Sequence, residues 1–290
     1  MSSPEQTSAP PSAASALPDD ANDLRGFHFK RLLRRPLASI LLAIFTMAAG
    51  VAGAILVGPA IGAAAAAAVL LLGLLIVFAI ADSRSEDAFF AAYAAQHGMA
   101  LSGRGPLPLA TPLLRKGDDR YAERALAGPL AGGVDGVLAL YTYETETTDS
   151  EGNTQTNYYR YTVSLTQVPE CAGFVPELYC QRKSGLRALE KLEDVFRRSK
   201  QRVELESEAL DKRYEIFAGK EQDANRLHQL FSPTFIVWLS DSAPQKFAFE
   251  LVDGTLCCYV SGHKKRVAEL NAIRAASATV ATRLREEATE

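Results

Sequence analysis

The residues of this chain that most often do chemistry are its cysteines and histidines. They stand at Cys171, Cys180, Cys257 and Cys258, and at His28, His97, His228 and His263. This scatter contains none of the closely spaced ligand pairs that bind zinc. The adjacent Cys257 and Cys258 would point to opposite faces of a strand, so they cannot chelate one ion together. We expect reduced thiols and no metal site.

Two of the histidines have surroundings that suit a general base. His97 falls where a helix should end, and a partial positive charge there would suit the helix C-terminus. His228 lies near Asp223 and Ser232 in the sequence, but no nucleophile elbow or ordered triad accompanies it. We therefore assign no catalytic residue, and the sequence favours a protein that is not an enzyme.

An acidic loop is the remaining candidate for ion binding. Its carboxylates are Glu144, Glu146, Asp149 and Glu151. Oxygen ligands of this kind suit calcium, but their spacing matches no known calcium loop, and a solvated hairpin tip is the favoured interpretation.

Short glycine and basic motifs give no ligand either. Gly103-Arg104-Gly105 matches neither of the common phosphate-binding glycine patterns. The basic cluster Lys264-Lys265-Arg266 is short for a nucleic-acid patch and stands in a net acidic region. We expect no cofactor and no nucleic-acid partner.

The elements that must position these residues follow a long apolar run. Leu37 to Ala81 are 45 residues without a charge, and Gly58-Pro59 divides them into stretches of 21 and 22 residues. At about 1.5 Å per residue, each stretch reaches about 32 Å and can cross a hydrocarbon core of about 30 Å. The run predicts transmembrane helices at 37–58 and 59–81. A cleaved secretory signal is disfavoured, because its apolar core would be shorter.

Small residues recur where the two predicted helices would face each other. They are Gly50, Gly53, Ala54, Gly58 and Gly62. Small side chains let helix backbones approach closely in lipid. We expect the two helices to pack as a hairpin, and a homodimer seam made by the same residues is the alternative.

Basic side chains precede the apolar run and set its predicted orientation. They are Arg25, Lys30, Arg31, Arg34 and Arg35. Bases beside a span stay in the cytoplasm, and the uncharged turn at Gly58 does not oppose translocation. We expect a multi-pass protein of the inner membrane, with both termini cytoplasmic and these bases at the lipid interface.

Composition then divides the chain into segments. Residues 1–22 are rich in Ser, Ala and Pro, which predicts a disordered tail, and residues 23–36 form a basic juxtamembrane segment. Residues 82–290 are long enough for one cytosolic domain.

Strand and helix signals alternate in that domain. Alternating β-rich residues predict a long hairpin at 136–148 and 156–168, a second hairpin at 247–259, and shorter strands at 178–181 and within 201–218. Helices are predicted at 85–97, 186–196, 223–230, from Ser232 onward, and at 263–287. The last carries an apolar stripe, Leu270, Ile273, Val280 and Leu284, which should pack on the sheet. The fold class is therefore α+β, a mixed or antiparallel sheet with helices packed on it.

Several of these segments also carry a resemblance to known proteins. Val203 to Ser207, Tyr214 to Ile216, and Leu230 to Phe235 resemble a group of bacterial membrane proteins of unknown function. The turn Gly117-Asp118-x-Arg120 and the helix end at His97-Gly98 agree with it, so the similarity covers residues 85–262. The resemblance implies an N-terminal transmembrane hairpin and a cytosolic α+β domain, and it implies no activity.

Three hypotheses for function remain open. The first is a membrane-anchored interaction or scaffold module that binds a partner protein or forms a homo-oligomer. The second is a sensor with an apolar ligand pocket near Trp238 and the strand with Tyr158, Tyr159 and Tyr161. The third is an uncharacterised hydrolase.

Overall fold

The computed structural model describes residues 18–22, 29, 36–183, 200–205 and 207–289. The chain divides into two compact units, Met1–Ala92 and Tyr93–Glu290. The five predicted interfacial bases, the predicted helix at 186–196 and most of the predicted tail lie outside the described residues.

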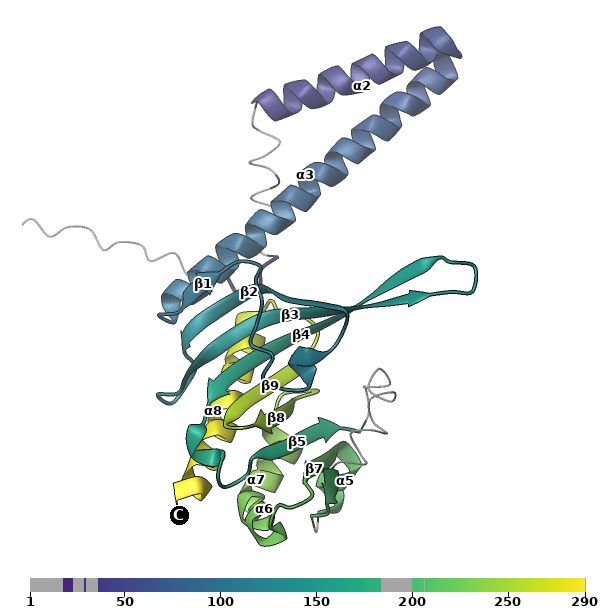
Figure 1. Ribbon diagram of the computed structural model, residues 1–290. Coiled ribbons are helices and arrows are strands. Elements are labelled where there is room, and N and C mark those ends of the chain that lie inside the picture. Colours follow the sequence, from purple (N-terminus) through teal and green to yellow (C-terminus); the bar gives the residue numbers. More distant parts are fainter. Residues whose placement is uncertain (1–17, 23–28, 30–35, 184–199, 206, 290) are drawn as a thin grey trace, which may run out of the picture. The chain divides into compact units, whose positions relative to one another are not determined.

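The first unit is built on two apolar helices, α2 (Pro36–Leu56) and α3 (Pro59–Gln96), joined at Gly58 (Figure 1). Gly58 has a φ of +131°, which a residue with a side chain rarely adopts, and no atom comes within 4 Å of the place of its Cβ. Within the described residues, α3 is the helix long and apolar enough to cross a membrane. The apolar part of α2, Ala43–Leu56, is shorter.

The helix α3 continues beyond the predicted end of the apolar run. A separate helix capped by Ser85 was expected, but Ser85 lies inside α3 and its hydroxyl donates to the Ala21 carbonyl. The sequence has no glycine or proline between Gly73 and Gly98, so nothing interrupts the helical hydrogen bonds. Gly98, with a φ of +64°, follows the end of the helix as expected.

The second unit holds a nine-stranded sheet, counted over the described residues, in the order β1-β2-β3-β4-β9-β8-β5-β7-β6. All neighbouring strands are antiparallel. The strands are β1 (Ala100–Ser102), β2 (Asp119–Pro129), β3 (Asp135–Thr148), β4 (Thr154–Gln167), β5 (Glu177–Arg182), β6 (Lys200–Val203), β7 (Tyr214–Gly219), β8 (Ala248–Val252) and β9 (Thr255–Ser261). The ends of β3 and β4 extend past the other strands as a two-stranded arm (Figure 1).

Short helices and one long helix accompany the sheet. They are η1 (Leu113–Arg115), η2 (Pro169–Cys171), α5 (Glu208–Arg213), α6 (Ala224–Leu230), α7 (Pro233–Val237), the π-helical turn η4 (Trp238–Ser242) and α8 (Val267–Thr289). The mixed helix and antiparallel sheet agrees with the predicted fold class. Strands β1 and β2 were not predicted, and α5 interrupts the strand expected at 201–218.

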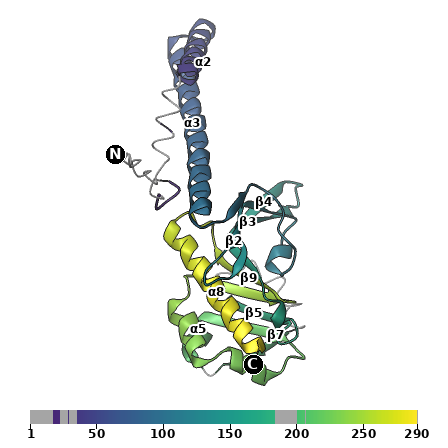
Figure 2. The same cartoon turned by 90° about the vertical axis from the view of Figure 1, so that its left-hand side faces the viewer.

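The two faces of the sheet have different covers. On one, which we call the helix face, α8 runs along β4 and β9 (Figure 2). Its predicted stripe is buried, since Leu270, Ile273, Val280 and Leu284 are at most 1% exposed. The other, the strap face, is covered by residues 103–118, which we call the strap, through Leu107, Leu113 and Leu114.

Candidate functional site

The small residues predicted to pack between the apolar helices lie where α2 meets α3. A Cβ atom added to Gly53 would lie 2.9 Å from the Gly62 Cα, and one on Gly50 would lie 3.2 Å from the Ala66 Cβ. A Cβ on Gly62 would lie 2.8 Å from the Ala54 Cβ. The helix backbones therefore approach to a distance that larger side chains would prevent.

Tyrosines line the strap face of β3, β4 and β9. The Tyr143 ring stacks on Tyr159 and Tyr161 with centroid distances of 4.8 and 5.9 Å, and Tyr161 meets Tyr259 edge to face at 5.9 Å. Burial raises the pKa of Tyr143, Tyr161 and Tyr259 above the usual value, so these hydroxyls stay neutral. The face is an aromatic surface with hydroxyl groups and has no phenolate.

A buried carboxylate holds the strap on this face. The Leu113 N–H donates to Glu250 Oε2 at 2.9 Å, and the Leu113 carbonyl accepts from the Tyr141 hydroxyl at 3.3 Å. Glu250 is 1% exposed and Lys116, in the strap, is 7% exposed. Burial raises the pKa of Glu250, which the Lys116 charge opposes, and burial lowers the pKa of Lys116 to about 8. Both groups thus lie at a site that favours their neutral forms.

A second polar cluster joins a hydroxyl, an imidazole and a carboxylate. His263 Nε2 lies 3.3 Å from Thr142 Oγ1, and its Nδ1 lies 3.7 Å from Glu123 Oε2. The register of β2 shifts at Glu123, and such a bulge breaks the regular alternation of side chains along the strand. However, Nε2 also lies 3.2 Å from the Tyr141 carbonyl, which can only accept, so Nε2 carries a proton and cannot take one from Thr142. Thr142 is fully buried, and the cluster acts as a cross-link between strands.

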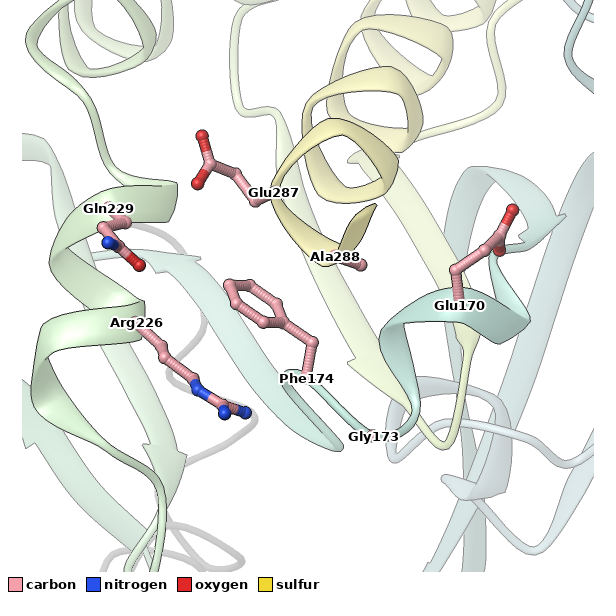
Figure 3. A pocket seen from close by; sticks show the side chains of 7 residues that line it. All are labelled: Glu170, Gly173, Phe174, Arg226, Gln229, Glu287 and Ala288. Carbon is pink, nitrogen blue, oxygen red and sulfur yellow. The ribbon is translucent and has the colours of Figure 1, made fainter. Parts of the chain in front are cut away.

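A groove of about 820 Å³ lies between α6, the end of α8 and the residues after η2 (Figure 3). The Phe174 ring lies in its middle, with Arg226 and Gln229 of α6 on one side and Glu170 on the other. The Arg226 guanidinium is 5.6 Å from the ring centroid. Both acids of the lining, Glu170 and Glu287, pair with arginines of α8. The lining offers one cation beside an aromatic ring and no nucleophile.

A second groove, of about 650 Å³, contains the tryptophan that the sensor hypothesis names. It is lined by Phe235 and Trp238, by Ala131 and Gly132, by Ser232 and Thr234, and by Ala275, Ala278, Thr279, Thr282, Arg283 and Glu286 of α8. Trp238 stacks on Phe235 at 5.6 Å. Tyr158, Tyr159 and Tyr161 do not line this groove: Tyr159 and Tyr161 pack on the strap face, and Tyr158 is 52% exposed.

The other predicted side chains lie in unreactive surroundings. All four cysteines are buried, and Cys257 and Cys258 face opposite sides of the sheet, next to Thr111 of the strap and Ser277 of α8. Burial and the charge of Arg274 lower the pKa of His97, which disfavours the positive charge expected at the helix end.

The acidic loop closes on itself at the tip of the arm. Asp149 Oδ1 accepts from the backbone N–H groups of Glu151 and Asn153, each at 2.9 Å. The described residues hold no group of three or more side chains that could bind a metal ion.

The sequence did not predict a role for three residues of these clusters, Glu250, Lys116 and Glu123. One signal was present for Glu250, because it is the single charge in the apolar run Phe247 to Val252. A carboxylate in a strand with no polar neighbours indicates a buried partner. Lys116 and Glu123 carry no comparable signal.

Comparison with known proteins adds little to this description. No protein-family model matches the chain, and no curated protein matches it. Among solved structures, the chain is similar to the mycobacterial trehalose monomycolate transport factor A, TtfA, at 9% sequence identity and a TM-score of 0.41. The match covers 68% of this chain and 90% of that one. Similarity at this level assigns neither a family nor an activity.

Proposed function

We propose that this protein is a membrane-anchored module whose second unit works in the cytosol, by binding a partner protein or by assembling with itself at the inner face of the membrane. The observation that carries the proposal is α3, whose most apolar 18-residue window has no buried residue. An exposed apolar helix of this length is unfavourable in water and favourable in a hydrocarbon core.

The proposed anchor is a hairpin that crosses the membrane twice. The close approach of Gly53 to Gly62 supports pairing of α2 with α3, as expected for helices that associate in lipid. The bases before α2 support a cytoplasmic N-terminus, and two crossings then return the chain to the cytoplasm.

An interaction role is favoured over hydrolysis because of the cluster at His263. Among the described residues it is the set that most resembles a catalytic relay, and its hydroxyl is buried while its ring nitrogen donates to a carbonyl. A hydrolase would need an exposed nucleophile beside a base free to accept its proton.

The second candidate is a ligand sensor, and the groove at Trp238 favours it. The groove combines two stacked aromatic rings with small side chains of α8, as apolar ligand sites do. Trp238 is the single tryptophan of the chain, so its fluorescence would report directly on an occupant.

Reporter fusions test the anchor and its orientation. A reporter after Glu290 should be active only if it works in the cytosol, and a matched fusion after Gly58 should be active only if it works outside. Both fusion proteins should stay in the membrane fraction after an alkaline carbonate wash.

A periplasm-active reporter after Glu290 would place the second unit outside and overturn the proposal, as would a chain recovered in the soluble fraction. The full chain, extracted from its own membranes in mild detergent, should also exceed the mass of one copy by light scattering. A lone monomer would contradict the interaction role while leaving the anchor intact.

A further inference from the structure

We propose that the strap is a hinged cover over the tyrosine-lined face, and that its latch, a buried carboxylate and a buried lysine, makes its closure depend on pH. This device is independent of the partner that the protein binds.

The hydrogen bonds of the strap suit a hinged movement. Its ends are fixed to the sheet by backbone bonds: Gly105 exchanges two with Ala122, at 3.0 and 2.8 Å, and the Asp118 N–H donates to the Glu144 carbonyl at 2.8 Å. Gly117 has a φ of +80°, and a Cβ there would lie 2.5 Å from the Glu144 carbonyl oxygen. A residue with a side chain could not make this turn.

The middle of the strap is bonded within itself. Arg115 donates to the Leu109 carbonyl at 2.8 Å and to the Ala110 carbonyl at 3.1 Å, and the Leu114 N–H donates to the Thr111 carbonyl at 3.1 Å. These bonds do not depend on the sheet. The segment can therefore leave the sheet as one piece. Its three leucines, the latch, and the bonds that Tyr141 and Arg120 donate to strap carbonyls decide whether it does.

The latch lies among groups that do not change charge in the same pH range. Glu250 is faced by Lys116 from the strap, and by Tyr141, Tyr161, Tyr179, Cys257 and Tyr259 from β3, β4, β5 and β9. Burial raises the pKa of each tyrosine and of Cys257, that of Tyr179 to about 12. Glu250 and Lys116 are thus the groups whose titration changes the charge beneath the strap.

The direction of the pH dependence follows from proton linkage. The pKa of Glu250 is raised above 4.5 when the strap is closed, so closure weakens as the pH rises from 4.5 through that raised pKa. The pKa of Lys116 is lowered from 10.5 to about 8, so closure strengthens as the pH rises from about 8 to 10.5. At a pH where Glu250 and Lys116 are both charged, the closed strap buries two charges, and its stability is at a minimum.

Hydrogen exchange of the full chain in detergent tests this dependence. The reporter is the amide of Leu113, which bonds to Glu250, together with its strap neighbours. After correction for the intrinsic chemical rate, its protection should pass through a minimum between the titration of Glu250 and that of Lys116. On either side it should rise by up to about tenfold per pH unit, the limit for one linked proton. Amides of α8 should stay level over the same range.

Variants assign the pH dependence on each side of the minimum to one group. Glu250→Gln should remove the rise in protection on the acidic side, and it keeps an oxygen that can accept from the Leu113 N–H. Lys116→Met should remove the rise on the alkaline side. In the double variant, the protection of the strap amides should be independent of pH and higher than in the native chain, since neutral groups replace a buried pair. The matched control is Glu208→Gln with Lys212→Met, an exposed pair 2.7 Å apart, which should change nothing.

Strap protection that does not change with pH in the native chain would overturn the proposal. So would protection in Lys116→Met that still rises on the alkaline side of the minimum. If Glu250→Gln does not fold, the native profile and Lys116→Met still decide, because Lys116 lies in the strap and not in the sheet. Equal pH dependence in α8 and in the strap would mean global unfolding and would also overturn it.

Discussion

The two faces of the sheet are buried by unlike means. The helix face lies under α8, a helix of 23 residues whose apolar stripe is at most 1% exposed. The strap face lies under a segment whose described regular structure is the single turn η1, held by a few leucines and by a buried carboxylate. Both covers exclude water from the middle of the sheet in the closed structure, since Cys257 and Cys258 are each fully buried.

The difference lies in how each cover can be removed. Lifting α8 would break its helix packing along β4, β9 and η2 at once, so it should occur only with unfolding of the unit. Lifting the strap would break the contacts of three leucines, the latch, and the bonds that Tyr141 and Arg120 donate to strap carbonyls, while its backbone end bonds remain. Equal burial can therefore hide unequal free energies of opening.

Removing each cover in turn should give the largest difference between the two faces, seen in whether the second unit still unfolds cooperatively. A chain truncated after Gly262, with its N-terminal part kept, should lose cooperative unfolding of its second unit. The reason is that the helix face becomes a large exposed apolar surface. A chain with residues 106–114 replaced by an equally long Gly/Ser linker should keep a cooperative transition. Thermal unfolding followed by near-ultraviolet circular dichroism distinguishes them. Similar loss in both chains would show that the strap is as essential as the helix.

Single large-to-small substitutions should give a smaller difference between the two faces, measured as the free energy of unfolding. Ile273→Ala should lower the free energy of unfolding by about 2–5 kcal/mol, as large-to-small changes in a core do. Leu114→Ala removes a side chain that is just as buried, but its cost cannot exceed the free energy of opening the strap. Urea unfolding of both variants measures the two costs. Equal costs would remove the distinction between the covers.

Sequence patterns predicted the parts of this fold in which local signals agree with the tertiary structure. The hairpins β3–β4 and β8–β9 have alternating residues with turn residues between them, and α8 has a regular stripe. Strand β2 was missed because Asp119–Pro129 is rich in alanine and arginine, which favour helix. Its pairing with β3 over most of its length overrides that preference.

The candidate sites were harder to predict than the strands. The strap has no periodicity, so nothing in residues 103–118 indicates which face it covers. Lys116 comes near Glu250 only because the chain crosses the sheet, across a gap of more than a hundred residues in the sequence. Thr142 and His263 meet Glu123 through a bulge, which shifts the register that alternation would predict.

The adjacent cysteines test the central claim, that the strap opens while α8 stays in place. Cys257 touches Thr111 of the strap, and Cys258 touches Ser277 of α8. Burial raises the pKa of both thiols, that of Cys258 to about 12, so each should react with iodoacetamide only after its cover opens. The measurement compares the labelling rates of Cys257 in Cys258→Ser and of Cys258 in Cys257→Ser, in the full chain at one pH. Cys257 should react at least about tenfold faster, which corresponds to about 1.4 kcal/mol between local and global opening. Equal rates, or faster labelling of Cys258, would contradict a strap that opens by itself.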